Sequence, residues 1–313
     1  MSETSPGAGY YDYPVVKRPV WTWEIPVYFW LGGMGAGAFI TTSLIQNFGS
    51  DDEARRTANG FYVAAAALLP CTPLLIKDLG RPDRFHHMLR IFKPLSPMNL
   101  GAWTLAGLTP LVLARAGRGA ADQGLLTGPA RALARLLPKI PLELGGSALG
   151  LVLAGYTGVL LAATNVPLWA KSKLLGGLFT ASAFSSGTAA VSLAAGRRLP
   201  EGLQHRLSLL ESAASATELA LLAGYVVQSG ETARPLTRER MAPLFWLGAV
   251  GMGALVPLVL HGVGRRQSGR PARLLSVGAS LAAIAGSLAL RWTVFEAGKD
   301  SSHDQAASFQ LSS

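Results

Sequence analysis

Residues 77–103, KDLGRPDRFHHMLRIFKPLSPMNLGAW, place charged side chains and two histidines between long apolar stretches. The stretch before them, residues 58–76, contains no charged side chain, and Gly80 and Pro82 follow it as residues that commonly end a helix. After Pro82, apolar side chains recur at helical spacing, which predicts a short helix lying in a membrane interface. The segment therefore indicates a protein whose titratable groups lie where lipid meets water.

The composition extends this interpretation to the whole chain. Of its 313 residues, 50% are hydrophobic and 15% are charged, and the mean hydropathy is +0.32. A soluble domain rarely combines these values, so the sequence predicts an integral membrane protein. Apolar runs of about 20 residues predict eight spans, at 25–46, 57–79, 98–115, 140–165, 167–195, 206–228, 241–262 and 272–295.

The formal net charge of +10 does not indicate a nucleic-acid-binding protein, because the basic residues are scattered among short segments between the spans. A slight excess of Lys and Arg in the segments opposite the N-terminus favours an orientation with both termini outside. The single cysteine, Cys71, lies within the second span. One thiol makes no internal disulfide and does not hold an iron–sulfur cluster by itself.

Residues 77–103 resemble the signature of the NrfD family, the membrane subunits of polysulfide reductase type. Three further motifs agree in order along the chain. Residues 23–37, with Trp23-Glu24 and a glycine-rich string, resemble the first span of the family, and residues 153–169 are similar to its fourth-span pattern. Arg291, followed by Ala297-Gly298, fits the last span. The resemblance covers nearly the whole chain.

This resemblance implies a quinone-interacting membrane anchor of a multi-subunit oxidoreductase. The expected subunit has eight spans, binds no redox centre of its own and lies in the inner (cytoplasmic) membrane of a bacterium, with both termini outside. It exchanges electrons between the quinone/quinol pool, menaquinone or ubiquinone, and a ferredoxin-like iron–sulfur subunit on the outer face. That partner would connect it to a catalytic subunit of the molybdopterin type or to a cytochrome.

The histidines do not favour a bound haem, which as a b-type group usually needs two histidines facing each other within a helical bundle. His86 and His87 lie on the N-terminal side, His261 ends the seventh span on the opposite side, and His205 and His303 lie in a loop and in the tail. We therefore expect no haem, no iron–sulfur cluster and no metal site in this chain.

A quinone site needs an apolar slot for the ring, with groups that bind its carbonyls and exchange protons. Candidates of this kind gather on the N-terminal side of the predicted spans, except that Tyr156 lies deeper by about 15 Å of helix rise. As catalytic candidates we name Asp78, His86 and His87, and as quinone-binding candidates Glu24, Tyr28, Lys77, Arg81 and Tyr156.

Each candidate also has a structural interpretation. Lys77, Asp78 and Arg81 could form a salt-bridge network that only orders the end of a helix. Tyr28 could belong to an aromatic belt at the membrane surface, beside the neighbouring tryptophans. At least one of the paired histidines could contact only headgroups or solvent, and the arginines of the segment could bind an acidic partner surface or anionic lipid.

The sixth span carries polar residues on one helix face, because Ser208, Glu211, Ser215 and Glu218 fall at i, i+3, i+7 and i+10. Ionisable groups at membrane depth are costly and are candidates for function. They either relay protons or coordinate an ion, or they pair with a cation, Arg291 or Lys173, to fix helix packing. Glu143, near the inner end of the fourth span, is either a surface residue or the mouth of a proton path. The candidates for such a path are Glu143, Glu211, Glu218 and Arg291.

We therefore predict an all-α integral membrane protein with eight transmembrane helices in two four-helix bundles. The expected parts are an outer N-terminal segment (1–24), a first bundle (25–165) whose interfacial loop 80–97 contributes to the quinone site, a second bundle (166–298) and a polar tail (299–313). The rival function is an ion- or proton-coupled secondary transporter, which the glutamates of the sixth span favour but which should show paired broken helices. A non-redox membrane scaffold is the third possibility.

Overall fold

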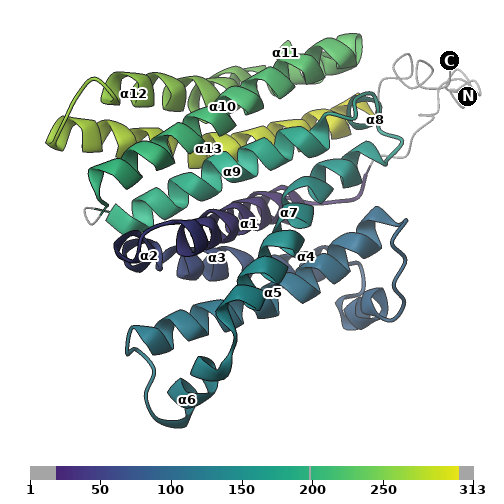
Figure 1. Cartoon of the computed structure of the whole chain (residues 1–313). Helices are drawn as coiled ribbons and strands as arrows, with labels where there is room; N and C mark the ends of the chain where they lie inside the picture. Colours follow the sequence, from purple (N-terminus) through teal and green to yellow (C-terminus); the bar gives the residue numbers. More distant parts are fainter. Residues whose placement is uncertain (1–18, 197–198, 303–313) are drawn as a thin grey trace, which may run out of the picture.

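The computed structural model describes residues 19–196 and 199–302, and every regular element in this part of the chain is a helix (Figure 1). The first half contains α1 (Glu24–Phe48), α2 (Asp51–Thr57), α3 (Gly60–Leu68), α4 (Cys71–Asp78), the 3-10 helix η1 (Pro82–Leu89), α5 (Pro97–Asp122), α6 (Gly128–Leu136) and α7 (Lys139–Ala162). The second half contains α8 (Pro167–Ala170), α9 (Leu175–Ala195), α10 (Glu201–Ser229), the 3-10 helix η3 (Gly230–Ala233), α11 (Arg234–Thr237), the π-helix η4 (Leu244–Leu255), α12 (Val256–Gly264) and α13 (Arg270–Ser301).

Seven helical segments of the described residues are long and apolar enough to cross a membrane. They comprise α1, α2–α4, α7, α9, α10–α11, η4–α12 and α13, so the prediction of an all-helical, multi-pass membrane protein is confirmed. The span predicted at 98–115 forms α5, which has 26 residues but is not among the seven. Polar residues such as Asn99, Thr104 and Arg115 lower its hydropathy. The count of eight spans therefore stays a prediction.

The long helices run side by side, with α1 near the middle of the molecule (Figure 1). α1 packs against α3, α4 and α7 of its own half and against α9 and α13 of the other half. Glycines allow the closest of these approaches, because a side chain at Gly37 would collide with the backbone of Ala183, and one at Gly187 with the backbone at Gly37. Since α1 and α9 join the two halves so closely, the division into two four-helix bundles stays a prediction.

Contacts between distant residues define the two ends of the molecule. Thr22, just before α1, binds Asp78 at the end of α4, and Leu168 of α8 donates its backbone N–H to Ser301 at the end of α13. These elements and η1 lie at one end, which we call the η1 end. At the other, the α6 end, lie α2, α6 and the α12–α13 connection (Figure 1).

The predicted loop at 80–97 thus lies at the same end as the start of α1 and the end of α13. That this end faces the outside of the membrane stays a prediction. Most of the predicted N-terminal segment 1–24 and of the tail 299–313 lies outside the described residues.

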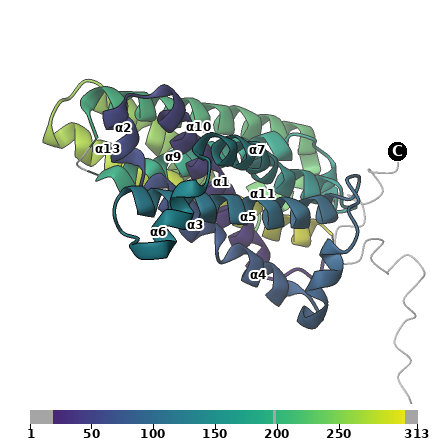
Figure 2. The ribbon, with the colours of Figure 1, turned by 60° about the horizontal axis from the view of Figure 1, so that its bottom comes forward.

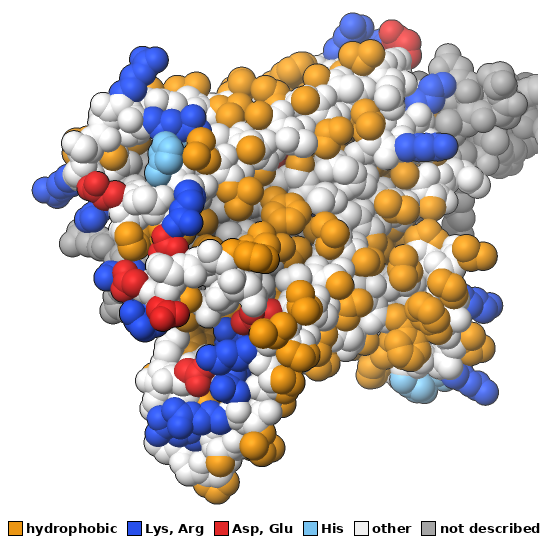
Figure 3. Space-filling view, viewed as in Figure 1, with side chains coloured by type: hydrophobic (Ala, Val, Ile, Leu, Met, Phe, Trp, Pro, Cys, Tyr) orange, Lys and Arg blue, Asp and Glu red, His pale blue; other side chains and the backbone are white. Residues whose placement is uncertain are grey.

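The surface agrees with a membrane-spanning arrangement. Lys and Arg gather toward the two ends of the molecule, and the side chains between them are mostly apolar on the face seen in Figure 3. Exposed apolar residues of that kind include Leu144 and Leu151 on α7, Val259 on α12 and Leu281 on α13. In the turned view, α4 and the segment that follows it stand at an edge of the molecule, beside α5 (Figure 2). This edge is where the first candidate site lies.

Candidate functional site

Two buried tyrosines meet between α1 and α7. The Tyr28 and Tyr156 hydroxyl oxygens are 2.6 Å apart, and the side chains are 1% and 6% exposed. The aromatic-belt interpretation of Tyr28 is therefore wrong, because α7 covers this face of α1. The Tyr156 ring lies directly over Gly101 of α5, where any side chain would collide with it. Sequence reasoning missed Gly101, and its one signal is a glycine inside a long apolar helix.

A second polar group surrounds the start of α1. Glu24 is buried, and its Oε1 lies 3.0 Å from Nζ of Lys77. Thr22 Oγ1 donates to Glu24 and also contacts Asp78, whose Oδ1 lies 2.8 Å from this hydroxyl and accepts the Thr22 backbone N–H at 2.9 Å. The structure thus brings Glu24, Lys77 and Asp78 together, and Glu24 lies one helical turn from Tyr28 on α1. Arg81 is exposed, and its side chain makes no hydrogen bond or ion pair with any described residue.

The paired histidines lie apart from the tyrosines. The expected short helix is confirmed as η1, in which His86 and His87 are both exposed and have ring centroids 4.5 Å apart. Within the described residues neither ring hydrogen-bonds to Tyr28 or Tyr156. The apolar side chains of η1, namely Phe85, Met88 and Leu89, line a cavity.

That cavity, of about 100 Å³, lies between α4, η1 and α5. Its lining is almost wholly apolar: Thr72, Leu75, Ile76, Leu79, Phe85, Met88, Leu89, Ala102, Leu105 and Ala106. Ala102 directly follows Gly101, against which Tyr156 packs, and Thr72 directly follows the buried Cys71. Neither tyrosine lines the cavity itself, so the cavity and the tyrosine pair are linked through these consecutive residues of α4 and α5.

The second half contains another buried ionisable group, centred on Glu211 of α10. Its Oε2 lies 2.8 Å from Nε2 of His261, and its Oε1 accepts hydrogen bonds from Ser192 at 2.9 Å and Ser280 at 3.2 Å. Glu211 is 0% and His261 3% exposed. Sequence reasoning expected Arg291 or Lys173 as the pairing cation and missed His261, whose one signal was its position at the end of an apolar span.

Arg291 of α13 is fully buried near the middle of the fold. Its guanidinium donates to the carbonyls of Phe29 (3.0 Å) and Phe179 (3.2 Å) and to the hydroxyls of Ser182 (3.0 Å) and Ser287 (2.6 Å). Glu218 is also buried and interacts with Arg291 electrostatically. No carboxylate of the described residues lies within 4.0 Å of the Arg291 guanidinium. A charge held in this way by neutral acceptors and a distant counter-charge is costly in a membrane.

Glu143 belongs to a separate pair in the first half. It is 3% exposed, and its Oε1 lies 2.6 Å from Nε of Arg115, while its Oε2 accepts from Asn47 at 2.5 Å. The surface interpretation of Glu143 is therefore wrong, because α5 contributes an equally buried arginine. The structure does not bring Glu143 together with Glu211, Glu218 or Arg291. No group of three or more His, Cys, Asp or Glu side chains suited to a metal occurs among the described residues.

Comparison with known proteins identifies the family of the chain. The family described as polysulphide reductase, NrfD, matches residues 14–300. One polysulfide reductase subunit of Wolinella succinogenes is 30% identical over 311 residues, covering 90% of this chain and 94% of that protein. Protein NrfD of Escherichia coli K12 is 30% identical over 308 residues, covering 90% of this chain and 95% of that protein. The chain belongs to the NrfD family of polysulphide reductase membrane proteins.

Proposed function

We propose that the protein is the quinone-exchanging membrane subunit of an oxidoreductase complex, and that the ring binds between α4, η1 and α5 beside Tyr156. The observation that carries this proposal is the buried Tyr28–Tyr156 pair next to an apolar cavity. A phenol pair in apolar surroundings is well suited to bind a quinone carbonyl. One hydroxyl donates a hydrogen bond to the carbonyl oxygen, while the second hydroxyl orients the first.

Reduction of a quinone takes up two electrons and two protons, so the site needs a route for protons as well as hydrogen bonds. In this proposal Tyr156 donates to the carbonyl, and Asp78 and Glu24 exchange protons with water through Thr22 and Lys77 at the η1 end. His86 and His87 are exposed and contribute to proton exchange only from the water side. Arg81 stands free to bind a partner or headgroup.

In this proposal η1 moves outward to admit the ring. At about 100 Å³ it is smaller than the roughly 150 Å³ cavity that holds benzene. Phe85, Met88 and Leu89 form the wall on the η1 side, and η1 buries none of its residues fully. Outward movement of η1 would therefore widen the slot at little energetic cost and admit a ring from the lipid.

The proposed electron donor or acceptor is a ferredoxin-like iron–sulfur subunit docked at the η1 end, connected to a catalytic subunit of the molybdopterin type or to a cytochrome. The name of the Wolinella relative, which denotes one lettered subunit of polysulfide reductase, supports membership of a multi-subunit complex. The segment from Arg84 to Lys93 offers exposed basic and apolar side chains at that end, the kind of surface on which an acidic partner docks.

Glu211 and its buried partners support the rival function, an ion-coupled transporter. We favour the redox function because the family relationship covers 90% of the chain, whereas an acidic residue in a span occurs in several classes of membrane protein. Titration of the purified complex with a soluble quinol analogue separates the alternatives, since neither a transporter nor a scaffold has a saturable quinol site.

The decisive variant is Tyr156→Phe, with Tyr62→Phe as its control. Losing one hydrogen bond of about 0.5 to 1.5 kcal/mol should weaken quinol binding roughly twofold to tenfold. The hydroxyl of Tyr62 is buried and has no partner among the described residues, so its removal should leave the affinity unchanged. Equal affinities for both variants and the wild type would contradict the proposed site.

A further inference from the structure

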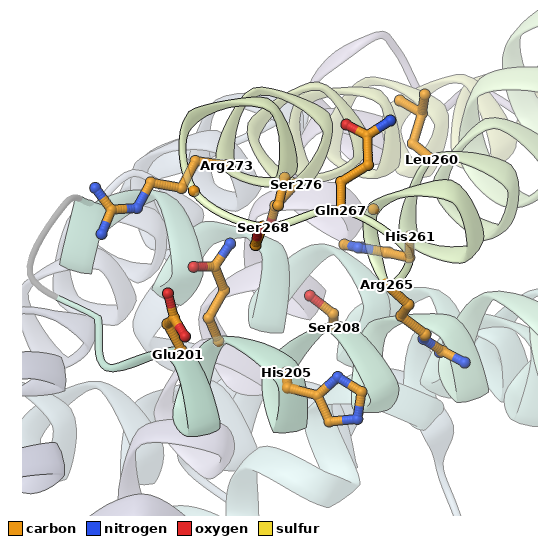
Figure 4. A pocket seen from close by; sticks show the side chains of 14 residues that line it. Glu201, His205, Ser208, Leu260, His261, Arg265, Gln267, Ser268, Arg273 and Ser276 are labelled. Carbon is orange, nitrogen blue, oxygen red and sulfur yellow. The ribbon is translucent and has the colours of Figure 1, made fainter.

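Two cavities at the α6 end converge on the buried Glu211. The first, of about 190 Å³, lies between the start of α10, the end of α12 and the start of α13 (Figure 4). The second, of about 700 Å³, lies between the end of α9 and α13. Gln204, Gly269, Arg273 and Ser276 line both cavities, so the two are adjacent and are treated together as one space. We call this space the vestibule.

The walls of the vestibule include the hydrogen-bond partners of Glu211. Ser192 and Ser280, which donate to Oε1, line the larger cavity, and His261, which contacts Oε2, lines the smaller one. Glu211 itself is 0% exposed. The carboxylate is thus separated from the vestibule by a single layer of polar side chains.

We propose that Glu211 and His261 form a proton-exchange site that receives protons from water in the vestibule, from the face opposite the proposed quinone site. A hydronium ion transfers one proton to the pair and leaves as water. The proton then resides on the imidazole or on the carboxylate, which one hydrogen bond joins, and the charge of the pair rises by one. Release of the proton reverses this change.

Charged side chains from α10, α12 and α13 surround the vestibule. Arg265 and Arg273 line the same space, and Arg265 also donates to Ser212 at 3.2 Å. His205 and Glu201 line its outer part on α10, Arg270 lies at its rim, and α9 and η4 present no charged side chain to the pair. Three arginines and one carboxylate therefore line the vestibule.

A series of hydroxyls extends from the pair toward the η1 end. Ser215 of α10, one turn beyond Glu211, is 3.1 Å from Ser185 of α9, and Glu218 follows after another turn. Beyond it, Ser182 and Ser287 bind Arg291, which donates to the carbonyl of Phe29 beside Tyr28. Protons moving between the vestibule and the proposed quinone site would pass along this series of hydroxyls. This extension rests on the proposed function.

Side-chain access tests the vestibule without any quinone. Cys71 is the sole cysteine, so a Cys71→Ala background permits single cysteines at Ser276, Ser280 and Ser287. Ser276 and Ser280 both line the vestibule, although Ser280 is 0% exposed. Ser287 lines neither cavity and lies about two turns deeper than Ser280. A small, permanently charged methanethiosulfonate applied to vesicles of each orientation should modify Ser276→Cys and Ser280→Cys from the α6 side only, at least about tenfold faster than Ser287→Cys.

Failure of the charged reagent at both positions, with reaction only by membrane-soluble N-ethylmaleimide, would show that lipid fills the space and would overturn the proposal. Protonation is measured separately, by pH-difference infrared spectroscopy of the full chain. Glu211→Gln should remove a carboxyl band and His261→Gln should shift it, whereas Glu143→Gln, in the other half, should leave it unchanged. A band that survives Glu211→Gln would equally overturn the assignment. Neither measurement depends on quinone binding.

Discussion

Gly101 gives a sharp test of how Tyr156 is positioned. A β-carbon at this position would overlap the Tyr156 ring, so Gly101→Ala must displace the phenol or push α5 away from α7. Displacement breaks the 2.6 Å contact with Tyr28 and moves the Tyr156 ring away from Gly101, which precedes the cavity-lining Ala102. The variant therefore removes the hydroxyl's function while keeping the tyrosine.

Two opposing effects set the magnitude. Overpacking a buried site costs about 1 to 3 kcal/mol, and alanine in a helix recovers about 1 kcal/mol relative to glycine. The net loss of stability should therefore be about 0 to 2 kcal/mol. The lost hydrogen bond, about 0.5 to 1.5 kcal/mol, should instead appear as a twofold to tenfold weaker affinity for a quinol analogue, roughly matching Tyr156→Phe.

Gly117→Ala is the matched control on the same helix, because nothing lies within 4 Å of a β-carbon at that position. We would measure quinol affinity of the purified complex by fluorescence quenching and thermal stability by scanning calorimetry. Gly117→Ala should retain the wild-type affinity. If Gly101→Ala also retained it, with the complex intact, the reasoning that Tyr156 contacts the ring would be refuted.

Three further tests address other parts of the account. Glu143→Gln should lower the free energy of unfolding by about 3 to 5 kcal/mol, because it leaves Arg115 buried without a counter-charge. It should not alter quinol affinity. A stability equal to that of the wild type in calorimetry would contradict the pairing. Gly298→Ala should impair folding, because a β-carbon at this position meets the indole of Trp169. Gly202→Ala is the control, since nothing lies within 4 Å of a β-carbon there. Equal yields of folded protein from the two variants would argue against the contact with Trp169. Replacing His86 and His87 by Gln should slow turnover less than Asp78→Asn does, because both rings are exposed whereas Asp78 binds Thr22 at the start of α1. The reverse order in steady-state assays would move the proton-exchanging role to the histidines.

Local patterns were enough to predict the helices and one end of the first site. Charge-free runs located the spans, and helical spacing after Pro82 predicted η1. Glu24, Lys77 and Asp78 could be grouped because each lies at the end of a predicted span, and helix ends on the same side of a membrane must share one surface.

Contacts made inside the membrane could not be predicted in the same way. Helical spacing gives the face on which Glu211 lies but not the helix that this face meets, so His261 was not identified as its partner. The same limit applies to Glu143, whose counter-charge comes from α5, and to Gly101, whose role depends on the rotation of α7 relative to α5. Such pairings depend on how the helices are rotated and shifted against each other, which a single sequence does not specify.

The central claim is that quinone binds between α4, η1 and α5 beside Tyr156. Photolabelling the intact complex with an azidoquinone and mapping the modified peptides by mass spectrometry tests it most directly. The account predicts labels within residues 72–106, around the cavity, that excess unlabelled quinol suppresses and that Tyr156→Phe reduces. Suppressible labelling confined to α10 or α13, with residues 72–106 unmodified, would contradict it.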